Sequence, residues 1–203
     1  MPIIVVGGAT RGVGKTSLIC ALIAAFPQFS WTAVKVTSHH YGQREPVSEE
    51  IIEQSATQAE QGTDTSRYLA AGARRALLVT ASTVGLPLVD IRAALGTDTN
   101  VIFESNTIIN FLNPDLCLAI VGASPSDSKP SFELLMQKAD ALVSSTETGT
   151  ERLNLLSSVP QFALTAPDRI SAEMLAWLQL RLWHCVRVVR AISSSCPRER
   201  APS

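Results

Sequence analysis

The sequence predicts an α/β fold in which helices cover both faces of a mostly parallel β-sheet. Short runs rich in β-branched residues alternate along the chain with segments of helical periodicity, which is the pattern of parallel strands joined by crossover helices. Hydrophobic residues make up 46% and charged residues 17% of the 203 positions, which is a folding composition of single-domain size. We expect one domain over residues 1–192 and a disordered tail over residues 193–203.

The predicted strands are short apolar runs that end in polar or turn-forming residues. In chain order they are Ile3–Val6, Thr32–Val36, Ala76–Val79, Val101–Phe103, Leu116–Val121, Ala141–Val143 and Gln161–Leu164.

The predicted helices lie between and after these strands. They are Thr16–Ala25, Glu49–Glu60, Thr65–Ala71, Leu86–Leu95, Ser131–Lys138, Glu147–Leu156 and Ser171–Ile192. The last one carries an apolar stripe through Met174, Leu178 and Leu182, which favours a helix docked on the sheet. A basic amphipathic helix of this kind can also bind a membrane surface or a partner, and that alternative stays open.

The first strand runs into a glycine-rich loop, "GGATRGVGKTSL", which opens a helix. Gly14, Lys15 and Thr16 match the end of the Walker A pattern G-x-x-x-x-G-K-[ST], in which main-chain N–H groups wrap phosphates. The leading glycine of that pattern falls on Ala9, so the loop counted from Gly8 is one residue longer than the strict form. The alternative is a turn that is glycine-rich for backbone reasons alone. The residues that we expect to contact a nucleoside triphosphate are Gly8, Arg11, Gly12, Val13, Gly14, Lys15, Thr16 and Ser17.

A magnesium ion is the expected companion of the triphosphate. In this pattern Lys15 reaches the β- and γ-phosphates and the hydroxyl of Thr16 binds the metal. Such sites usually add a carboxylate at the end of a nearby strand, and Glu104 closes the apolar run Val101–Phe103. We therefore predict Thr16 and Glu104 as metal ligands and Lys15 and Glu104 as catalytic residues. The alternative for Glu104 is a strand-end acid that only faces water.

A polar cluster follows the second predicted strand in "VKVTSHHYG". Lys35, His39 and His40 would project from the carboxyl end of that strand, where open α/β sheets bind their ligands. We predict that these residues belong to a substrate or switch region. A metal site at the two histidines, or plain surface positions, are the alternatives.

The balance of charges and the length of the apolar runs argue against some classes of partner. The chain has 17 basic and 18 acidic residues, which argues against nucleic acid or an anionic membrane as a partner held by bulk electrostatics. The longest apolar runs are too short to span a bilayer, and the sequence opens on a strand and not on a signal-type segment. A cytoplasmic location is the default expectation.

Three separate stretches resemble the MobB-type P-loop GTPases, accessory proteins of molybdopterin guanine dinucleotide biosynthesis. They are "GVGKTSL", "AVKVTSHHYG" and "GTDTSRYLAAGARRALLV". The last is similar to the family's Asp-Ser-x-Arg helix, here Asp64, Ser66 and Arg67, which is followed by Ala-Gly-Ala and a strand. The resemblance spans roughly the first 145 residues. It departs from the family where Glu104 is followed by Ser105 and Asn106 instead of glycine, and in the longer loop, which resembles that of dethiobiotin synthetase.

The MobB resemblance implies an accessory protein that binds Mg²⁺ with GTP or ATP, hydrolyses the nucleotide slowly and acts on a cofactor-assembly partner. Pairing into a homodimer is a further option by analogy with other P-loop proteins. The sequence contains no Asn-Lys-x-Asp, so the choice between the two nucleotides stays open. The alternative function is a small-molecule kinase or ATP-dependent ligase of the dethiobiotin-synthetase type, with Lys35, His39 and Glu104 lining the acceptor pocket.

Overall fold

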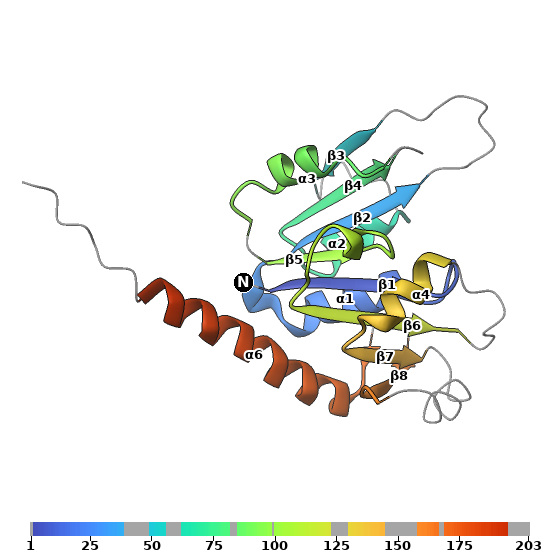
Figure 1. Ribbon diagram of the computed structural model, residues 1–203, viewed down its shortest axis with the longest axis vertical. Helices are drawn as coiled ribbons and strands as arrows, with labels where there is room; N and C mark the ends of the chain where they lie inside the picture. Colours follow the sequence, from blue (N-terminus) through green and yellow to red (C-terminus); the bar gives the residue numbers. More distant parts are fainter. Residues whose placement is uncertain are drawn as a thin grey trace, which may run out of the picture.

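A mixed sheet with helices on both faces makes up the computed structural model (Figure 1). The structure describes residues 2–38, 49–55, 62–81, 85–98, 100–122, 130–144, 158–166 and 169–194. Within these residues nine strands form one sheet in the order β3-β4-β2-β5-β1-β6-β7-β8-β9. The expected α/β class is therefore confirmed.

The seven inner strands are parallel and each coincides with a predicted strand. They are β1 (Ile3–Gly8), β2 (Thr32–Ser38), β4 (Arg75–Ala81), β5 (Val101–Glu104), β6 (Leu116–Val121), β7 (Ala141–Ser144) and β8 (Gln161–Ala166). The two edge strands, β3 (Glu50–Gln54) and β9 (Arg169–Ile170), are antiparallel to their neighbours. All seven parallel strands end at the same edge of the sheet, which is where such folds place their ligands.

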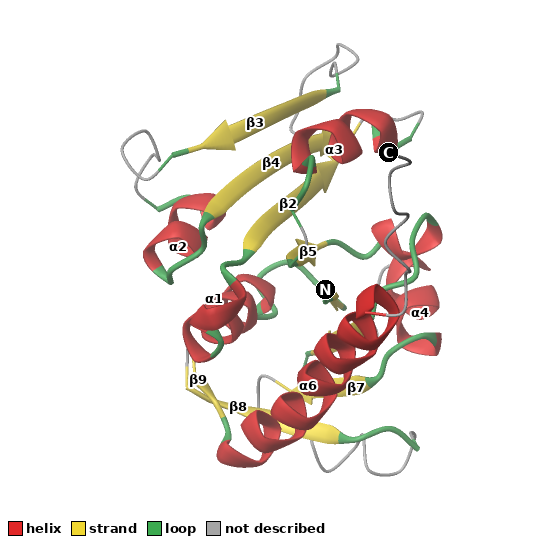
Figure 2. Ribbon diagram, turned by 90° about the vertical axis from the view of Figure 1, so that its left-hand side faces the viewer, coloured by secondary structure: helices red, strands yellow, loops and turns green. Residues whose placement is uncertain are grey.

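The helices divide between the two faces of the sheet (Figure 2). α1 (Lys15–Ala25), α2 (Asp64–Ala70) and α6 (Ala172–Ser194) pack into one apolar layer, and α3 (Leu88–Leu95) and α4 (Pro130–Gln137) into the other. Two 3-10 turns, η1 (Pro27–Phe29) and η2 (Ile108–Asn110), complete the described elements. β1 shows how the sheet separates the layers: Ile4 and Val6 face the first and Val5 the second, as the alternation of a strand requires.

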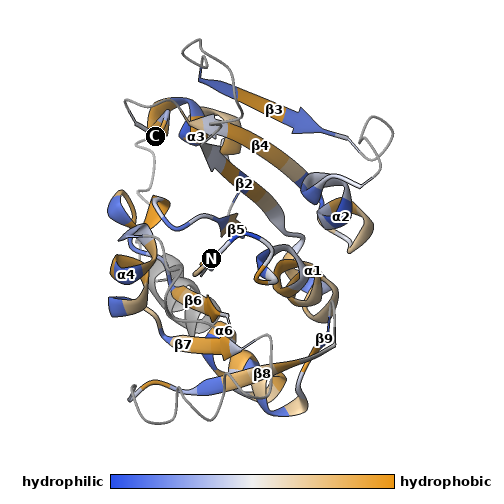
Figure 3. Cartoon of the chain, turned by 90° about the vertical axis from the view of Figure 1, so that its right-hand side faces the viewer, coloured by the Kyte–Doolittle hydropathy of each residue, from blue (hydrophilic) through white to orange (hydrophobic). Residues whose placement is uncertain are grey.

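α1 is the central helix of the first layer and holds the glycine-rich loop in place. Its residues Leu18–Ile23 are all buried, so this part of the helix is enclosed around its whole circumference, and most of the helix is coloured as hydrophobic in Figure 3. An apolar helix with burial around its whole circumference belongs in a core and not at a surface. The start of α1 is therefore fixed relative to the sheet.

The docking predicted for the C-terminal helix is confirmed at its beginning. Met174, Leu178 and Leu182 of α6 are buried in the first apolar layer, and Arg181 pairs with Asp140 at the start of β7. Side chains beyond residue 183 lie outside the described part of the helix. Within the described residues, no helix combines the length and apolarity needed to cross a bilayer.

The predicted helix Glu49–Glu60 is wrong, because its first half is a strand. Glu50–Gln54 forms β3 and pairs antiparallel with β4. Glutamate and glutamine favour helix locally, but strand pairing supplies partners for the edge of β4, and the Glu53 carboxylate binds Arg75 at 2.6 and 2.7 Å. Ile51 also packs on the second apolar layer. Tertiary pairing therefore overrides the local preference.

Two other predictions fall mainly or wholly outside the described residues. The predicted helix Glu147–Leu156 lies entirely outside them. Of the predicted tail, residues 193 and 194 complete α6, and residues 195–203 lie outside the described part of the chain.

Candidate functional site

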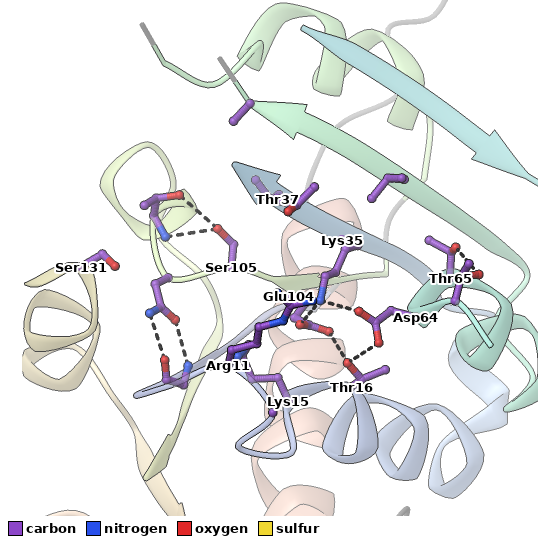
Figure 4. Close-up of a pocket in the computed structure, with 18 of the residues that line it drawn as sticks. Arg11, Lys15, Thr16, Lys35, Thr37, Asp64, Thr65, Glu104, Ser105 and Ser131 are labelled. Carbon is purple, nitrogen blue, oxygen red and sulfur yellow. Dashed lines mark hydrogen bonds and ion pairs between the residues drawn. The ribbon is translucent and has the colours of Figure 1, made fainter. Parts of the chain in front are cut away.

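A cavity of about 1040 Å³ opens at the carboxyl edge of the sheet. The loop between β1 and α1, the ends of β2 and β5 and the start of α2 line it, and its far side reaches Phe111 after η2 and Ser131 at the start of α4. Figure 4 shows Lys15, Thr16, Lys35, Asp64 and Glu104 grouped at its centre. The cavity thus joins most of the residues predicted from the sequence.

The glycine-rich loop has the backbone that a phosphate cradle needs. Gly12 and Gly14 have φ angles of 75° and 105°, a region that side-chain-bearing residues rarely enter. Gly14 is the N-cap of α1 and has no side chain that could cap the first turn. Its carbonyl accepts the N–H of Leu18 at 2.9 Å. The first-turn N–H groups therefore face the loop, where they favour an anion.

Lys15 lies over this loop, and Val13 fills its base. The Nζ atom of Lys15 donates to the carbonyl of Thr10 at 3.0 Å, so the ammonium already stands above the cradle. Val13 was predicted to contact the nucleotide, but its side chain is buried in the first apolar layer. Only its main chain can serve a ligand.

Three oxygen-bearing side chains converge at the start of α1. The Oγ1 atom of Thr16 lies 2.8 Å from Oδ1 of Asp64 and 2.9 Å from Oε2 of Glu104. One hydroxyl proton can be donated to only one of them at a time. The predicted pair of Thr16 and Glu104 is thus brought together, and Asp64 joins it from the first turn of α2.

Lys35 bridges the two carboxylates. Its Nζ lies 2.7 Å from Oδ2 of Asp64 and also pairs with Oε1 of Glu104. Burial opposes the charged ammonium, but the charge of Glu104 and hydrogen bonds with both carboxylates outweigh it and raise the pKa of Lys35. For Asp64, burial would raise the pKa, but Lys35 and the hydroxyl of Thr16 lower it overall. This ion pair is therefore charged at neutral pH.

A further hydrogen-bond partner of Glu104 is Tyr68, which approaches the carboxylate from the buried side. Its ring is fully buried and its hydroxyl donates to Oε2 of Glu104. Burial, followed by the charge of Glu104, raises the pKa of Tyr68 well above its ordinary value, so the hydroxyl stays protonated and remains a donor. Glu104 itself is only 2% exposed.

Asp64 and Tyr68 were not among the predicted site residues. Asp64 appeared only within the Asp-Ser-x-Arg resemblance. The spacing of Asp64 and Tyr68 is i, i+4, which places both on one face of a helix. That spacing, combined with the resemblance, is the signal that could have found them.

The cavity carries a net positive charge in its described part. Its basic side chains are Arg11, Lys15, Lys35 and Arg67 and its acidic ones Asp64 and Glu104, so four positive charges less two negative ones leave two. Arg67 also reaches across from α2 and donates to Oγ of Ser17 at 3.0 Å. A basic concave site of this kind attracts polyanions. His39 and His40, predicted nearby, lie outside the described residues.

The donor set suits magnesium. A threonine hydroxyl and two carboxylates are hard oxygen ligands, which Mg²⁺ prefers. Among the described residues no three His, Cys, Asp or Glu side chains gather into a metal cage. A usual Mg²⁺ site combines one or two carboxylates with phosphate oxygens, and Asp64 and Glu104 are the two carboxylates here.

Comparison with known proteins adds evidence on the fold. No protein-family model and no curated protein matches the chain. Among solved structures it is similar to LpxK from Aquifex aeolicus, an "apo" form crystallised in complex with ATP, with a TM-score of 0.52 and 18% sequence identity. The match covers 80% of this chain and 53% of the other, so the chain spans about half the length of that structure. The similarity is one of fold, and it agrees with the predicted α/β class of P-loop NTPase type.

The pairing of Lys35 with a buried carboxylate predicts a large stability effect. Replacing Lys35 with methionine leaves Glu104 without its cation, and removal of one partner from a buried pair costs about 3 kcal/mol or more. Urea unfolding at neutral pH should show that loss. Lys138→Met is the control, because Lys138 is exposed and its ammonium donates to a main-chain carbonyl, that of Ile109, and not to a buried carboxylate. Equal losses in the two variants would contradict the assigned role of Lys35.

The lowered pKa of Asp64 predicts a specific acid sensitivity. Because its pKa is lower in the folded than in the unfolded chain, its contribution to stability is complete above the unfolded value and is lost as pH falls through the folded one. From about pH 6 to about pH 3 the wild type should lose more unfolding free energy than Asp64→Asn. Asp90→Asn, at an exposed site on α3, should behave as the wild type. A wild-type slope in Asp64→Asn would refute this.

Proposed function

We propose that this protein is an Mg²⁺-dependent NTPase that binds GTP or ATP at the β1–α1 loop and hydrolyses it slowly as an accessory protein. The observation that carries the proposal is that Thr16, Asp64 and Glu104 converge beside the glycine-rich loop. The ammonium of Lys15 lies over the same loop. A hydroxyl, carboxylates and an ammonium at a helix start are the parts that position a triphosphate and its metal.

Each residue has a distinct role in this proposal. Main-chain N–H groups of the loop and the ammonium of Lys15 hold the β- and γ-phosphates. Thr16 and Glu104, joined by Asp64, hold Mg²⁺, which when bound neutralises charge that develops on the phosphates. Lys35 pairs with both carboxylates and orients them, and Tyr68 fixes Glu104 from the buried side.

We expect slow hydrolysis of the nucleotide because both carboxylates of the site already bind other side chains. Lys35 and Thr16 bind both Asp64 and Glu104, and Tyr68 also donates to Glu104. Among the described cavity residues, no other carboxylate is present to orient an attacking water. An NTPase of this kind depends mainly on electrostatic stabilisation by its loop and cations.

The resemblance to the MobB-type proteins supports a place for this activity in molybdenum-cofactor assembly. Two of the resembling stretches, the loop and the Asp-Ser-x-Arg helix, contact each other through Thr16 with Asp64 and Ser17 with Arg67. A partner enzyme of cofactor assembly would then respond to the bound nucleotide. The similarity to an ATP-bound structure supports ATP as the nucleotide, and the family resemblance supports GTP.

A second function, phosphoryl transfer to a small molecule, is favoured by the size of the cavity. Its volume of about 1040 Å³ is at the upper end for ligand pockets. It extends past the loop to Phe111 and Ser131. That space would receive an acceptor in a kinase or ATP-dependent ligase of the dethiobiotin-synthetase type.

Nucleotide binding is tested with Lys15→Ala. Calorimetric titration with Mg·ATP and Mg·GTP should give heat with the wild type and none with the variant, because the loop loses the cation that meets the β- and γ-phosphates. Circular dichroism should show the same fold in both. Lys138→Ala, far from the loop in sequence and at the surface, should bind as the wild type. Unchanged binding in Lys15→Ala would overturn the proposal.

The two functions are separated by the rate at which nucleoside diphosphate forms, which hydrolysis and phosphoryl transfer to an acceptor both produce. For the accessory protein we expect slow formation of the diphosphate from the preferred nucleotide, at a rate that rises on addition of the protein fraction of a cell extract. The low-molecular-weight fraction should leave the rate unchanged, since no acceptor is needed. Rapid turnover that depends on the low-molecular-weight fraction would reject the accessory function in favour of the kinase or ligase.

A further inference from the structure

Asn106 makes a double contact with the start of the phosphate loop. Its Oδ1 accepts the N–H of Gly8 at 2.8 Å and its Nδ2 donates to the carbonyl of Gly8 at 3.0 Å. The two residues are 98 positions apart in sequence. This asparagine stands in the segment where the chain departs from its resembling family, and the proposed function gives it no role.

The carboxamide of Asn106 adds one more pair of hydrogen bonds to β1, beyond the point where its pairing with β5 ends. On one side β1 pairs with β6 as far as Gly8 opposite Ile120. On the other side its pairing with β5 ends at Val6 opposite Glu104. A side-chain amide carries the same donor and acceptor as a peptide group, so Asn106 replaces the missing strand partner. Gly8 is therefore bonded to Asn106 on the β5 side, and the next residue, Ala9, donates to the carbonyl of Ile120 at 3.0 Å on the β6 side.

Gly8 in turn supports the far end of the loop. A Cβ atom at this position would lie 2.5 Å from Cγ1 of Val13 and 3.0 Å from Cγ of Lys15. The loop thus folds back so that the stem of Lys15 rests directly on the main chain of Gly8. Wherever Gly8 is placed, Lys15 is placed with it.

We propose that Asn106 is a positioning residue that sets the geometry of the phosphate loop relative to the metal-binding carboxylate. Asn106 holds Gly8, Gly8 carries Lys15, and Glu104 lies two residues before Asn106 on the same segment. One short segment, residues 104–106, therefore fixes both the carboxylate and the ammonium. The inference rests on the proposed binding of a triphosphate.

The experiment compares Asn106→Ala with Asn100→Ala. Asn100 precedes β5 at the opposite edge of the sheet and also uses its amide on a main-chain carbonyl, that of Phe29 at 2.6 Å. Both variants lose side-chain to main-chain bonds, but only the first touches the loop. The probe is inorganic tripolyphosphate with Mg²⁺, titrated by calorimetry at a temperature well below each variant's unfolding midpoint.

We expect Asn106→Ala to bind tripolyphosphate about 10- to 100-fold more weakly than the wild type, the usual loss for a supporting residue. Asn100→Ala should bind as the wild type even where its midpoint falls. Gly8→Ala, which pushes on Val13 and Lys15 while keeping the asparagine, should show the same weakening as Asn106→Ala. Asn106→Ser removes both bonds with a smaller change in polarity and supplies the same comparison if the alanine variant fails to fold.

The outcomes separate this inference from the proposed function. Wild-type affinity in Asn106→Ala, or equal weakening in Asn100→Ala, would reject the positioning role and leave the proposed function intact. A wild type that binds neither tripolyphosphate nor Mg·ATP nor Mg·GTP would reject the proposed function, and the inference with it.

Discussion

The carboxylate of Glu104 is the group around which the site is organised. It lies almost wholly out of solvent at the end of β5, and a buried charge is costly unless it is paired and hydrogen-bonded. Lys35 of β2, Thr16 of α1 and Tyr68 of α2 supply those partners. Three elements are therefore held against the end of one strand by a single charge. The phosphate loop inherits its position from that arrangement.

The strand order explains why these partners meet. β5 lies between β1 and β2, so the loop that follows β1 and the lysine of β2 flank the carboxylate from either side. α2 packs beside α1 on the same face of the sheet, which brings Asp64 to the first turn of α1. The two carboxylates then share one ammonium and one hydroxyl. A cavity with a net positive charge remains for a polyanion.

Local pattern was sufficient to predict the inner strands and the loop, because each is encoded by a short contiguous run. It also predicted that Thr16 and Glu104 would meet, since the loop and helix that follow one parallel strand and the last residue of another lie at the same carboxyl edge of the sheet. It failed for β3, whose glutamates favour helix until pairing with β4 decides the matter. The roles of Tyr68 and Asn106 were not predicted, for a different reason. Their partners are 36 and 98 residues away, and such contacts depend on how elements pack.

Glu104 and the glycine-rich loop belong, in the proposed function, to one metal–triphosphate site that Asn106 and Lys35 hold together. Electron paramagnetic resonance of Mn²⁺, used in place of Mg²⁺, tests most directly whether Glu104 and the loop form one site. With ATP or GTP present, the wild type should bind one slowly exchanging Mn²⁺ per chain, and Glu104→Gln should lose it while remaining folded. No nucleotide-dependent Mn²⁺ in the wild type, or undiminished binding in Glu104→Gln, would contradict the account.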